Sequence, residues 1–357
     1  MPRYSVLDNR STSPRRLPAS ARRRRYALAG TLSLSLSLAL VALVGCSSAT
    51  SEPSDPAEAA STRTVQDYFG PVEVPAEPSR VVAADPISLA LMLSLDAKPV
   101  AASFNPLALP AHVDQRAAGV ENIAGEGGGF DPNVEAILAQ DPDLIIVVAG
   151  YDGEGEKAWN KEIYDKLAAS GVPTYGFAYN DGVSLDDVSN GVTAVGEVLG
   201  KQAEAAASMQ GLTDRMAELK QRVSDAGLAD KPVSAVRLSE RGEYSIRVGT
   251  GESIAFRGLG MAQPEGQQDP SVFRIDITDE TLNTLASADT LFVYTDEGAV
   301  AERDAISNAP LWSTLPAVQQ DRVHWVSASA WNSSDPIGLG LILDDIETLF
   351  VEPAEQS

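Results

Sequence analysis

From residue 80 onward, short apolar runs alternate with stretches whose apolar residues recur at helical spacing. Runs of strand length lie at 81–83, 100–102, 144–148 and 172–175. Stretches with helical spacing lie between them, at 87–95, 134–138 and 163–169. Regular alternation of strands and helices is typical of a parallel sheet whose strands are joined by crossover helices. The first half of the chain therefore predicts an α/β unit.

A long helical stretch separates this unit from a second one. It runs over 185–223, and Gly200 is expected to interrupt it. The part after Gly200 has about 23 residues and would be about 35 Å long, which is enough to cross a junction between domains. The alternation then resumes, with strands expected at 233–238, 244–248, 291–294 and 323–326 and helices at 253–259, 279–286 and 339–350. The predicted fold class is α/β, with two three-layer α/β lobes joined by a single long interdomain helix and a ligand cleft between the lobes.

The N-terminal segment has a different pattern. Four arginines at 22–25 precede an uncharged stretch at 26–44, and Leu43-Val44-Gly45 leads into Cys46. A basic region, an apolar core and small residues before a cleavage site indicate a secretory signal, although about 19 uncharged residues would also suit a transmembrane anchor. The small residues end at the only cysteine of the chain, and this pattern resembles the lipobox of bacterial lipoproteins. The resemblance implies that Cys46 is lipidated and that the protein works outside the cytoplasm, tethered to a membrane.

These patterns divide the chain into five segments. Residues 1–45 are expected to form the lipoprotein signal peptide, and 46–62, rich in Ser, Ala, Pro, Glu and Asp, a flexible tether. The first α/β lobe is expected at 63–185, a helical linker at 186–226 and the second α/β lobe at 227–357. Because the chain has no second cysteine, the fold must rest on its apolar core and not on disulfides.

Charge and composition exclude several classes of partner. Eight arginines and one aspartate precede Cys46, so that segment carries +7; since the whole chain carries −23, the remainder carries about −30. So acidic a protein is not expected to bind nucleic acid or anionic lipid headgroups. The two histidines are too few for an ordinary transition-metal site; His324 is expected to be structural, and His112 falls in a predicted loop without an identifiable partner. We expect a monomer without a cofactor.

Five segments of the chain resemble one protein family, in the order in which they occur. They are GPVEVPAEPSRVVAAD, DPNVEAILAQDPDLIIV, LGMAQPEGQ, ITDETLNTLASADTLFV and APLWSTLPAVQQDRVHWVSASAW, and the resemblance covers roughly residues 65–350. The family is that of the substrate-binding lipoproteins of ABC importers for iron-siderophores and cobalamin. The resemblance implies two α/β lobes bridged by one rigid helix, permease subunits as partners and a ferric-siderophore as ligand, with cobalamin or haem as alternatives.

Two glutamates follow predicted helix starts, one in each lobe. In the first lobe Asp131 is expected to cap a helix in which Leu138 faces inward, which leaves Glu135 facing water. In the second lobe Thr278 is expected to cap a helix whose Glu280 points away from the core. A favourable interaction with the helix dipole accounts for a glutamate at both positions. In the family that the chain resembles, a glutamate at each of these positions docks onto arginines of the permease.

Two arginines are candidates for ligand contacts in the second lobe. Arg237 and Arg247 flank a predicted turn, and if their strands pair as a hairpin they would lie opposite each other on one face. Like charges in that arrangement are unfavourable unless an anionic group lies between them. The oxygen atoms of an iron chelator fit that description, because a guanidinium binds them with two parallel hydrogen bonds. The alternative is two surface arginines that pair with Glu240 or Glu243.

Aromatic residues near the carboxyl ends of predicted strands complete the expected site, since ligands of parallel sheets bind at those ends. Phe104, Tyr151, Tyr244 and Trp331 are candidates for the cleft, with packing in the core as the alternative. A haem ligand would need an axial side chain, which Tyr151 or Tyr179 would supply.

The sequence patterns of common enzymes give little support to a catalytic function. The chain has no Gly-x-Ser-x-Gly motif, and two histidines leave little material for a Ser-His-Asp triad. Gly127-Gly128-Gly129 is followed by Phe130-Asp131-Pro132 and is therefore not a nucleotide phosphate loop. The paired carboxylates of a secreted glycosidase are compatible with so acidic a composition and leave that class as a remote alternative. The predicted function is capture of a ferric-siderophore outside the cytoplasm and its delivery to an ABC importer permease, without chemistry on the ligand.

Overall fold

The computed structural model describes residues 61–106, 109–150, 160–179, 184–239, 243–296 and 300–356. Cys46, the predicted lipidation site, and Tyr151, a predicted residue of the cleft, lie outside these ranges. None of the helices within them combines the length and apolar character that crossing a bilayer requires.

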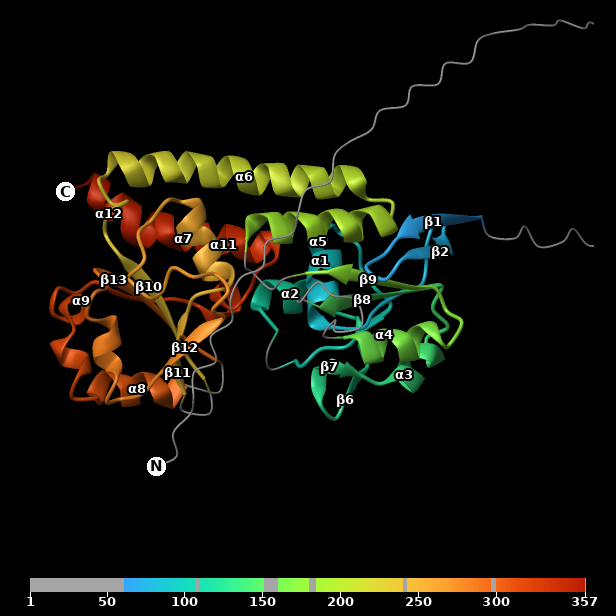
Figure 1. Ribbon diagram of the computed structural model, residues 1–357, viewed down its shortest axis with the longest axis horizontal. Coiled ribbons are helices and arrows are strands. Elements are labelled where there is room, and N and C mark those ends of the chain that lie inside the picture. Colours follow the sequence, from blue (N-terminus) through green and yellow to red (C-terminus); the bar gives the residue numbers. More distant parts are fainter. Residues whose placement is uncertain are drawn as a thin grey trace, which may run out of the picture. The chain divides into compact units, whose positions relative to one another are not determined.

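The first lobe is built on a five-stranded sheet in which every pair of neighbouring strands is parallel (Figure 1). The strand order is β5-β4-β3-β8-β9. The strands are β3 (Val81–Ala83), β4 (Ala101–Ala102), β5 (Glu121–Asn122), β8 (Leu144–Gly150) and β9 (Thr174–Ala178). The helices are α1 (Pro86–Ser94), α2 (Ala111–Arg116), α3 (Val134–Ala139) and α4 (Lys161–Ala168). The predicted alternation of strands and helices is confirmed.

The inner strand β8 shows why this lobe has three layers. All of its residues are buried. Leu144 and Ile146 belong to the core cluster that includes residues of α1, whereas Ile145 and Val147 belong to a separate cluster with residues of α3 and α4. Successive side chains of a strand point to opposite faces, so helices cover both faces of the sheet.

Two hairpins that the hydrophobic pattern did not predict belong to this lobe. β1 (Thr62–Gln66) pairs antiparallel with β2 (Pro71–Pro75), and β6 (Ala124–Gly125) pairs antiparallel with β7 (Gly128–Pro132). Both are short and rich in proline or glycine, which hides them from a search for alternating apolar residues.

The hairpin β6–β7 changes the start of α3. Because Asp131 lies in β7, the helix is capped by Asn133, whose side chain accepts a hydrogen bond from the Ala136 amide at 3.0 Å. The Asp131 carboxylate instead accepts a hydrogen bond from the Gly127 amide at 3.0 Å. The predicted cap at Asp131 is therefore wrong, and so is the inward direction of Leu138, which is 39% exposed.

The long helical region is confirmed together with its interruption. α5 (Leu185–Val198) and α6 (Gln202–Asp225) are separated at Gly200, whose φ of +71° favours glycine. With 24 residues, α6 is about 36 Å long. Its buried residues recur at three- to four-residue spacing from Ala205 to Val223, so one face of the helix packs along its whole length.

The second lobe contains another five-stranded sheet, of order β12-β11-β10-β13-β14, in which β11 runs opposite to both neighbours. The strands are β10 (Val233–Leu238), β11 (Tyr244–Arg247), β12 (Arg274–Ile277), β13 (Thr290–Thr295) and β14 (Val323–Trp325). The helices are α7 (Gly251–Gly258), α8 (Val300–Asn308), α9 (Pro316–Gln319), α10 (Ala328–Trp331), α11 (Pro336–Ile346) and α12 (Glu352–Glu355), with a π-helical turn at Glu347–Val351.

The helix predicted at 279–286 is shorter in the structure. Only Leu282–Leu285 is helical, as a 3-10 turn. Thr278 does not cap it: its hydroxyl donates to the Glu280 carboxylate at 2.8 Å, and its amide donates to the Thr281 hydroxyl at 2.8 Å. Such local bonds of threonine side chains compete with helix formation, which explains why this predicted helix start is wrong.

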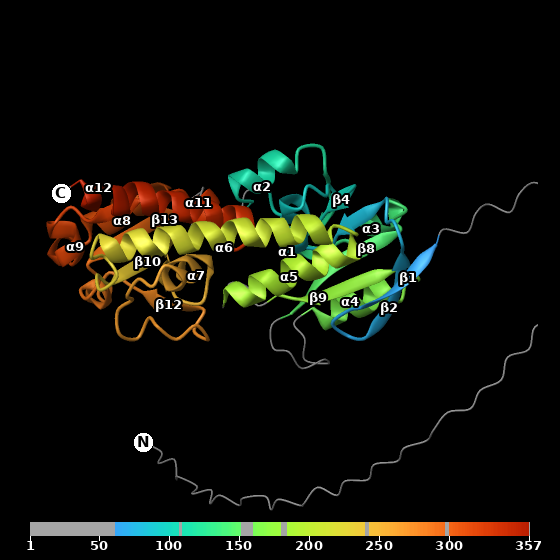
Figure 2. The same cartoon turned by 90° about the horizontal axis from the view of Figure 1, so that it is seen from above.

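One core cluster continues from the first lobe into the second. It contains Leu144 of β8, Leu212 and Leu219 of α6, Phe292 of β13 and Leu343 of α11. α6 packs against α5, α7 and α11, and Figure 2 shows it extending over elements of both lobes. The two lobes are therefore joined by one long helix that shares its apolar face with both.

Candidate ligand site

The carboxyl edge of the first sheet is shaped by the start of α1. Asp85 follows β3 and caps α1, accepting hydrogen bonds from the Ser88 amide at 2.8 Å and the Ser88 hydroxyl at 2.7 Å. It also accepts one from the Val148 amide of β8 at 2.8 Å. Burial raises the pKa of the Asp85 carboxyl, although these hydrogen bonds act to lower it. The same bonds hold Pro86 and Ile87, the first residues of α1, at the sheet edge.

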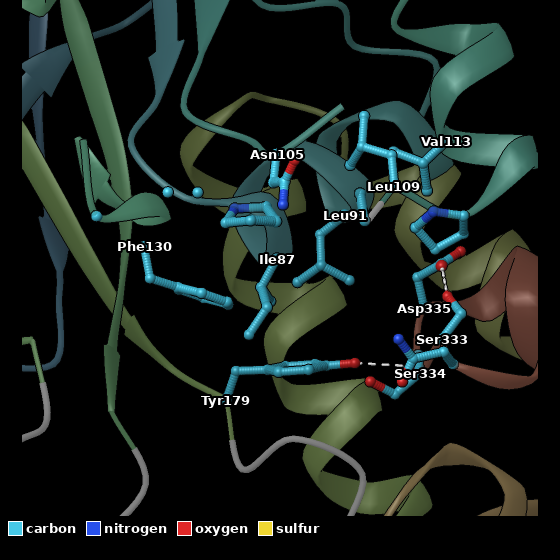
Figure 3. A pocket seen from close by; sticks show the side chains of 17 residues that line it. Ile87, Leu91, Asn105, Leu109, Val113, Phe130, Tyr179, Ser333, Ser334 and Asp335 are labelled. Atoms are coloured by element: carbon cyan, nitrogen blue, oxygen red, sulfur yellow. Dashed lines mark hydrogen bonds between the residues drawn. The ribbon is translucent and has the colours of Figure 1, made fainter. Parts of the chain in front are cut away.

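A pocket of about 390 Å³ lies at this edge and is lined by both lobes (Figure 3). The first lobe contributes the start of α1, the segment around α2, the hairpin β6–β7 and the end of β9, and the second lobe contributes residues 332–335, between α10 and α11. Its volume falls within the range of small-molecule sites. The apolar lining includes Ile87, Leu91, Leu109, Val113 and Phe130, and the polar lining Asn105, Tyr179, Asn332, Ser333, Ser334 and Asp335. The pocket lies in the predicted cleft between the lobes.

A glycine lets the hairpin β6–β7 pack directly against the edge of this pocket. A Cβ atom built on Gly129 would lie 2.7 Å from Cγ of Pro86 and 3.1 Å from Cα of Phe104. The Ser103 hydroxyl donates to the Gly129 carbonyl at 2.8 Å and holds the hairpin in this place. The next residue, Phe130, lines the pocket and is 42% exposed, so the glycine brings a large aromatic side chain to the wall.

Two hydrogen bonds cross from one lobe to the other beside the pocket. The Tyr179 hydroxyl donates to the Ser334 carbonyl at 2.9 Å (Figure 3), and His112 Nε2 lies 2.8 Å from Asp335 Oδ2. His112 thus lies on the short helix α2 and has a partner, which corrects the expectation of a loop residue without one. Burial opposes ionisation of Asp335, but the hydrogen bonds that it accepts, from His112 above all, lower its pKa.

The predicted hairpin of β10 and β11 is present, but its two arginines are not directly opposite. Arg237 pairs with Ser245, and Arg247 pairs with Ala235, so the arginines lie diagonally on one face of the hairpin. The Arg237 guanidinium donates two hydrogen bonds to Asp296, at 2.9 and 2.8 Å. The expected direct opposition is therefore wrong, because the register is shifted by two residues.

Arg247 lies in a buried polar cluster. Its side chain is 4% exposed, and its Nε lies 3.7 Å from a carboxylate oxygen of Glu252. The Tyr294 hydroxyl donates a hydrogen bond to the same oxygen, and burial raises the pKa of Tyr294 well above its usual value. The guanidinium carbon of Arg247 lies 4.6 Å from the centre of the Phe273 ring, which covers it. The guanidinium Nε and Nη1 have no hydrogen-bond partner among the described residues. Glu252 partly balances the charge of Arg247, while two N–H donor atoms of the arginine make no hydrogen bond with the described residues.

The other predicted aromatic residues lie mostly in the core. Trp331 is fully buried, donates its indole N–H to Asp345 at 2.8 Å and stacks on Phe292 at 4.8 Å. Phe104 is 7% exposed and belongs to the same core cluster. Tyr244 is also 7% exposed and borders a different hollow. The structure thus does not bring these three side chains to the pocket wall.

The hollow beside Tyr244 has a volume of about 400 Å³ and lies at the β11–β12 edge of the second lobe. Glu280 borders it and is exposed, and the hydrogen bond from Thr278 lowers the pKa of its carboxyl. Glu135 is likewise exposed, in the first turn of α3. Both predicted glutamates are therefore exposed, one on each lobe, and their role in permease docking stays a prediction.

Patterns in the sequence mark only some of the residues that line the pocket. Asn105 lies at the carboxyl end of the strand predicted at 100–102, where ligands bind, whereas nothing in the sequence distinguishes Asp335 from an ordinary loop or capping residue. The run of glycines before Phe130 does not match a nucleotide phosphate loop, and nothing else in its sequence indicates a ligand site. Within the ranges that the structure describes, no group of three or more His, Cys, Asp or Glu side chains is arranged to hold a metal ion.

Comparison with known proteins identifies the architecture. A family model described as periplasmic binding protein matches residues 81–328. The chain is 28% identical over 331 residues to YfiY of Bacillus subtilis, a probable siderophore-binding lipoprotein, covering 88% of this chain and 96% of YfiY. It is 24% identical to YxeB of the same organism, an iron(3+)-hydroxamate-binding protein, covering 94% of this chain and 99% of YxeB. The solved structure of Staphylococcus aureus SirA complexed with staphyloferrin B superposes with a TM-score of 0.65 at 21% identity, covering 80% of this chain and 98% of SirA.

Proposed function

Because the chain belongs to the periplasmic binding protein family, we propose that it captures a ferric-siderophore complex outside the cytoplasm and delivers it to the permease of an ABC importer. The observation that carries this proposal is the pocket between the lobes, which is built by segments at the carboxyl ends of parallel strands. The full-length match to siderophore-binding relatives supports the choice of ligand. The protein then acts by binding alone, and the iron stays in its chelator.

Both lobes contribute to ligand binding in this proposal. The first lobe and the segment 332–335 offer an apolar wall with a few polar groups. Arg237 and Arg247 lie on the second-lobe hairpin, and the unused donors of Arg247 are suited to an anionic oxygen. Tyr151 is a further proposed contact, whereas Trp331 supports the site from within the core.

The proposal includes two interactions with the membrane and its proteins. Lipidation of Cys46 would tether a monomer to the extracytoplasmic face of the membrane. Glu135 and Glu280, exposed on separate lobes, would each meet an arginine of a permease subunit. A carboxylate on each lobe gives two points of attachment, which fixes the orientation of the binding protein as well as its position.

A titration of the mature protein against a panel of ligands tests the proposed function. Tryptophan fluorescence would be followed with ferrioxamine B, ferric enterobactin, ferric staphyloferrin B, cobalamin and haem. We expect saturable quenching by at least one ferric siderophore and by neither cobalamin nor haem. Saturable binding of cobalamin or haem alone would assign the other ligand class, and no binding of any ferric complex would contradict the proposal.

A further inference from the structure

Two hydrogen bonds from the first lobe converge on one short segment of the second. Tyr179 at the end of β9 binds the carbonyl of Ser334, and His112 of α2 binds the carboxylate of Asp335. Both acceptors lie in the segment 332–335, which also lines the pocket. Both hydrogen bonds across the lobe boundary therefore end on a segment that forms part of the pocket wall.

The environment of His112 leaves its imidazole one polar contact among the described residues, the one with Asp335. The side chain is 10% exposed, so the ring has lost most of its water. Its Nε2 faces Asp335, while its Nδ1 is buried and has no hydrogen-bond partner among the described residues. Burying a polar atom without a partner is unfavourable. Within the described part of the chain, the polar contact that offsets this cost lies across the lobe boundary.

Asp335 is held in place independently of His112. Its carboxylate accepts hydrogen bonds from the Ser333 hydroxyl and from the amides of Ile337 and Gly338, the latter two at 3.0 and 3.2 Å, and so caps α11. A second element confines the segment, because a Cβ atom on Gly251, the first residue of α7, would lie 2.1 Å from the Ser333 carbonyl oxygen. His112 is therefore attached to a point that is rigid within the second lobe.

We propose that the His112–Asp335 hydrogen bond, together with that of Tyr179 to Ser334, is a cross-lobe tie that sets the width of the ligand pocket. His112 is a positioning residue in this scheme, because it holds the pocket wall without touching the ligand. The effect on ligand affinity rests on the proposed function, whereas the effect on lobe spacing does not. The competing explanation is that the imidazole merely fills space between α2 and the second lobe.

Lobe spacing is measured first, without ligand. The chain from residue 46, with Cys46→Ser, has no other cysteine, so spin labels can be placed by Glu162→Cys on α4 and Ser307→Cys on α8, which are both exposed. Distance distributions between the labels would be recorded for the parent, His112→Leu, His112→Gln and Tyr179→Phe. Glutamine keeps an N–H donor near the position of Nε2, whereas leucine fills the space without a donor. His324→Leu, at the other histidine, is the matched control.

We expect His112→Leu and Tyr179→Phe to widen the distance distribution, and His112→Gln and His324→Leu to keep that of the parent. Ferrioxamine B titration should show a dissociation constant about tenfold higher for His112→Leu, the scale of one hydrogen bond to a carboxylate. Equal distributions for all variants would overturn the tie, and so would equal widening by leucine and glutamine, which would indicate packing alone.

Two outcomes separate the tie from the proposed function and from misfolding. If the parent does not bind ferrioxamine B, that bears on the ligand, while the distance distributions still decide whether the tie exists. If His112→Leu does not fold, as judged by circular dichroism, Tyr179→Phe gives the decisive result, because it removes one hydroxyl from the second bond; a parent-like distribution would then overturn the proposal.

Discussion

Gly129→Ala tests whether the hairpin β6–β7 must pack tightly against the pocket. The added methyl would lie 2.7 Å from Cγ of Pro86 and 3.1 Å from Cα of Phe104. Both are closer than carbon atoms normally approach, and the second contact is with backbone, which cannot rotate away. The hydrogen bond from Ser103 to the Gly129 carbonyl opposes a shift of the hairpin. The substitution therefore strains the fold or displaces the wall that carries Phe130.

The expected cost follows from two opposing effects. Overpacking a well-filled site costs about 1–3 kcal/mol. Alanine also reduces the conformational entropy of the unfolded chain, which offsets about 0.4–1 kcal/mol of that cost. We expect Gly129→Ala to lower the free energy of unfolding by about 1–2 kcal/mol, and to weaken ligand binding because the hairpin that carries Phe130 is displaced.

Urea unfolding followed by tryptophan fluorescence, with the ligand titration alongside, measures both effects. Gly211→Ala is the matched control, because Gly211 lies in α6 and a Cβ atom there has no neighbour within 4 Å. That control should stabilise the protein by about 0.8–1 kcal/mol through helix propensity. Parent-like stability and affinity for Gly129→Ala would refute the close packing inferred for the hairpin.

Four further perturbations address the membrane, the permease, the ligand and pH. Replacing Glu135 and Glu280 together by alanine should abolish uptake in cells, and a loss of ligand affinity above about tenfold, or 1.4 kcal/mol, would place them in the ligand site instead. Arg237→Ala should raise the dissociation constant of a ferric siderophore by about ten- to 150-fold through loss of a charge-assisted hydrogen bond; a change below threefold in the fluorescence titration would count against a ligand contact. Burial would raise the pKa of Asp143, but three hydrogen bonds to its carboxylate lower it, so its stabilisation is present above the unfolded value near 3.8 and is lost as the pH falls through the folded value. Asp143→Asn should therefore lower the free energy of unfolding by about 1 kcal/mol at pH 7 and leave it unchanged in strong acid. Urea titrations at both pH values measure this difference, and an equal loss at the two would contradict it. Cys46→Ala should prevent incorporation of radiolabelled palmitate, and equal labelling of variant and parent would contradict the lipid anchor.

The helices and strands of the two lobes were predictable because residues that become buried are apolar and recur at the spacing of a helix or a strand. The residues of β8 are apolar throughout, because helices cover both faces of the sheet to which it belongs. Gly200 marked the end of α5 because a positive φ there favours glycine. The turn-like sequence before Tyr244 allowed for a hairpin, and the structure shows one between β10 and the antiparallel strand β11. Such features depend on neighbours close in sequence, which a single chain displays.

The site was less predictable because its contacts join distant residues. His112 and Asp335 are 223 positions apart, and neither lies in a pattern that identifies a partner. The direction of Leu138 was wrong because the buried residue of α3 is Ile137, and Leu138 lies about 100° round the helix from it. Arg237 was expected in the ligand site, but nothing in its local sequence indicates that Asp296 would bind it through two hydrogen bonds. Side-chain partners of this kind are set by packing between elements, not by local spacing.

The close packing around α6 restricts how the pocket can open. A Cβ atom on Gly196 of α5 would lie 2.6 Å from Cβ of Ala205, and one on Gly258 of α7 would lie 2.0 Å from Sδ of Met216. Elements of both lobes thus approach this helix closely, and separating them would expose apolar surface at about 25 cal/mol per Å². A wide hinge motion is therefore costly, and small changes in lobe spacing are left as the means to admit a ligand. The proposed tie of His112 and Tyr179 across the cleft would act on motion of this size.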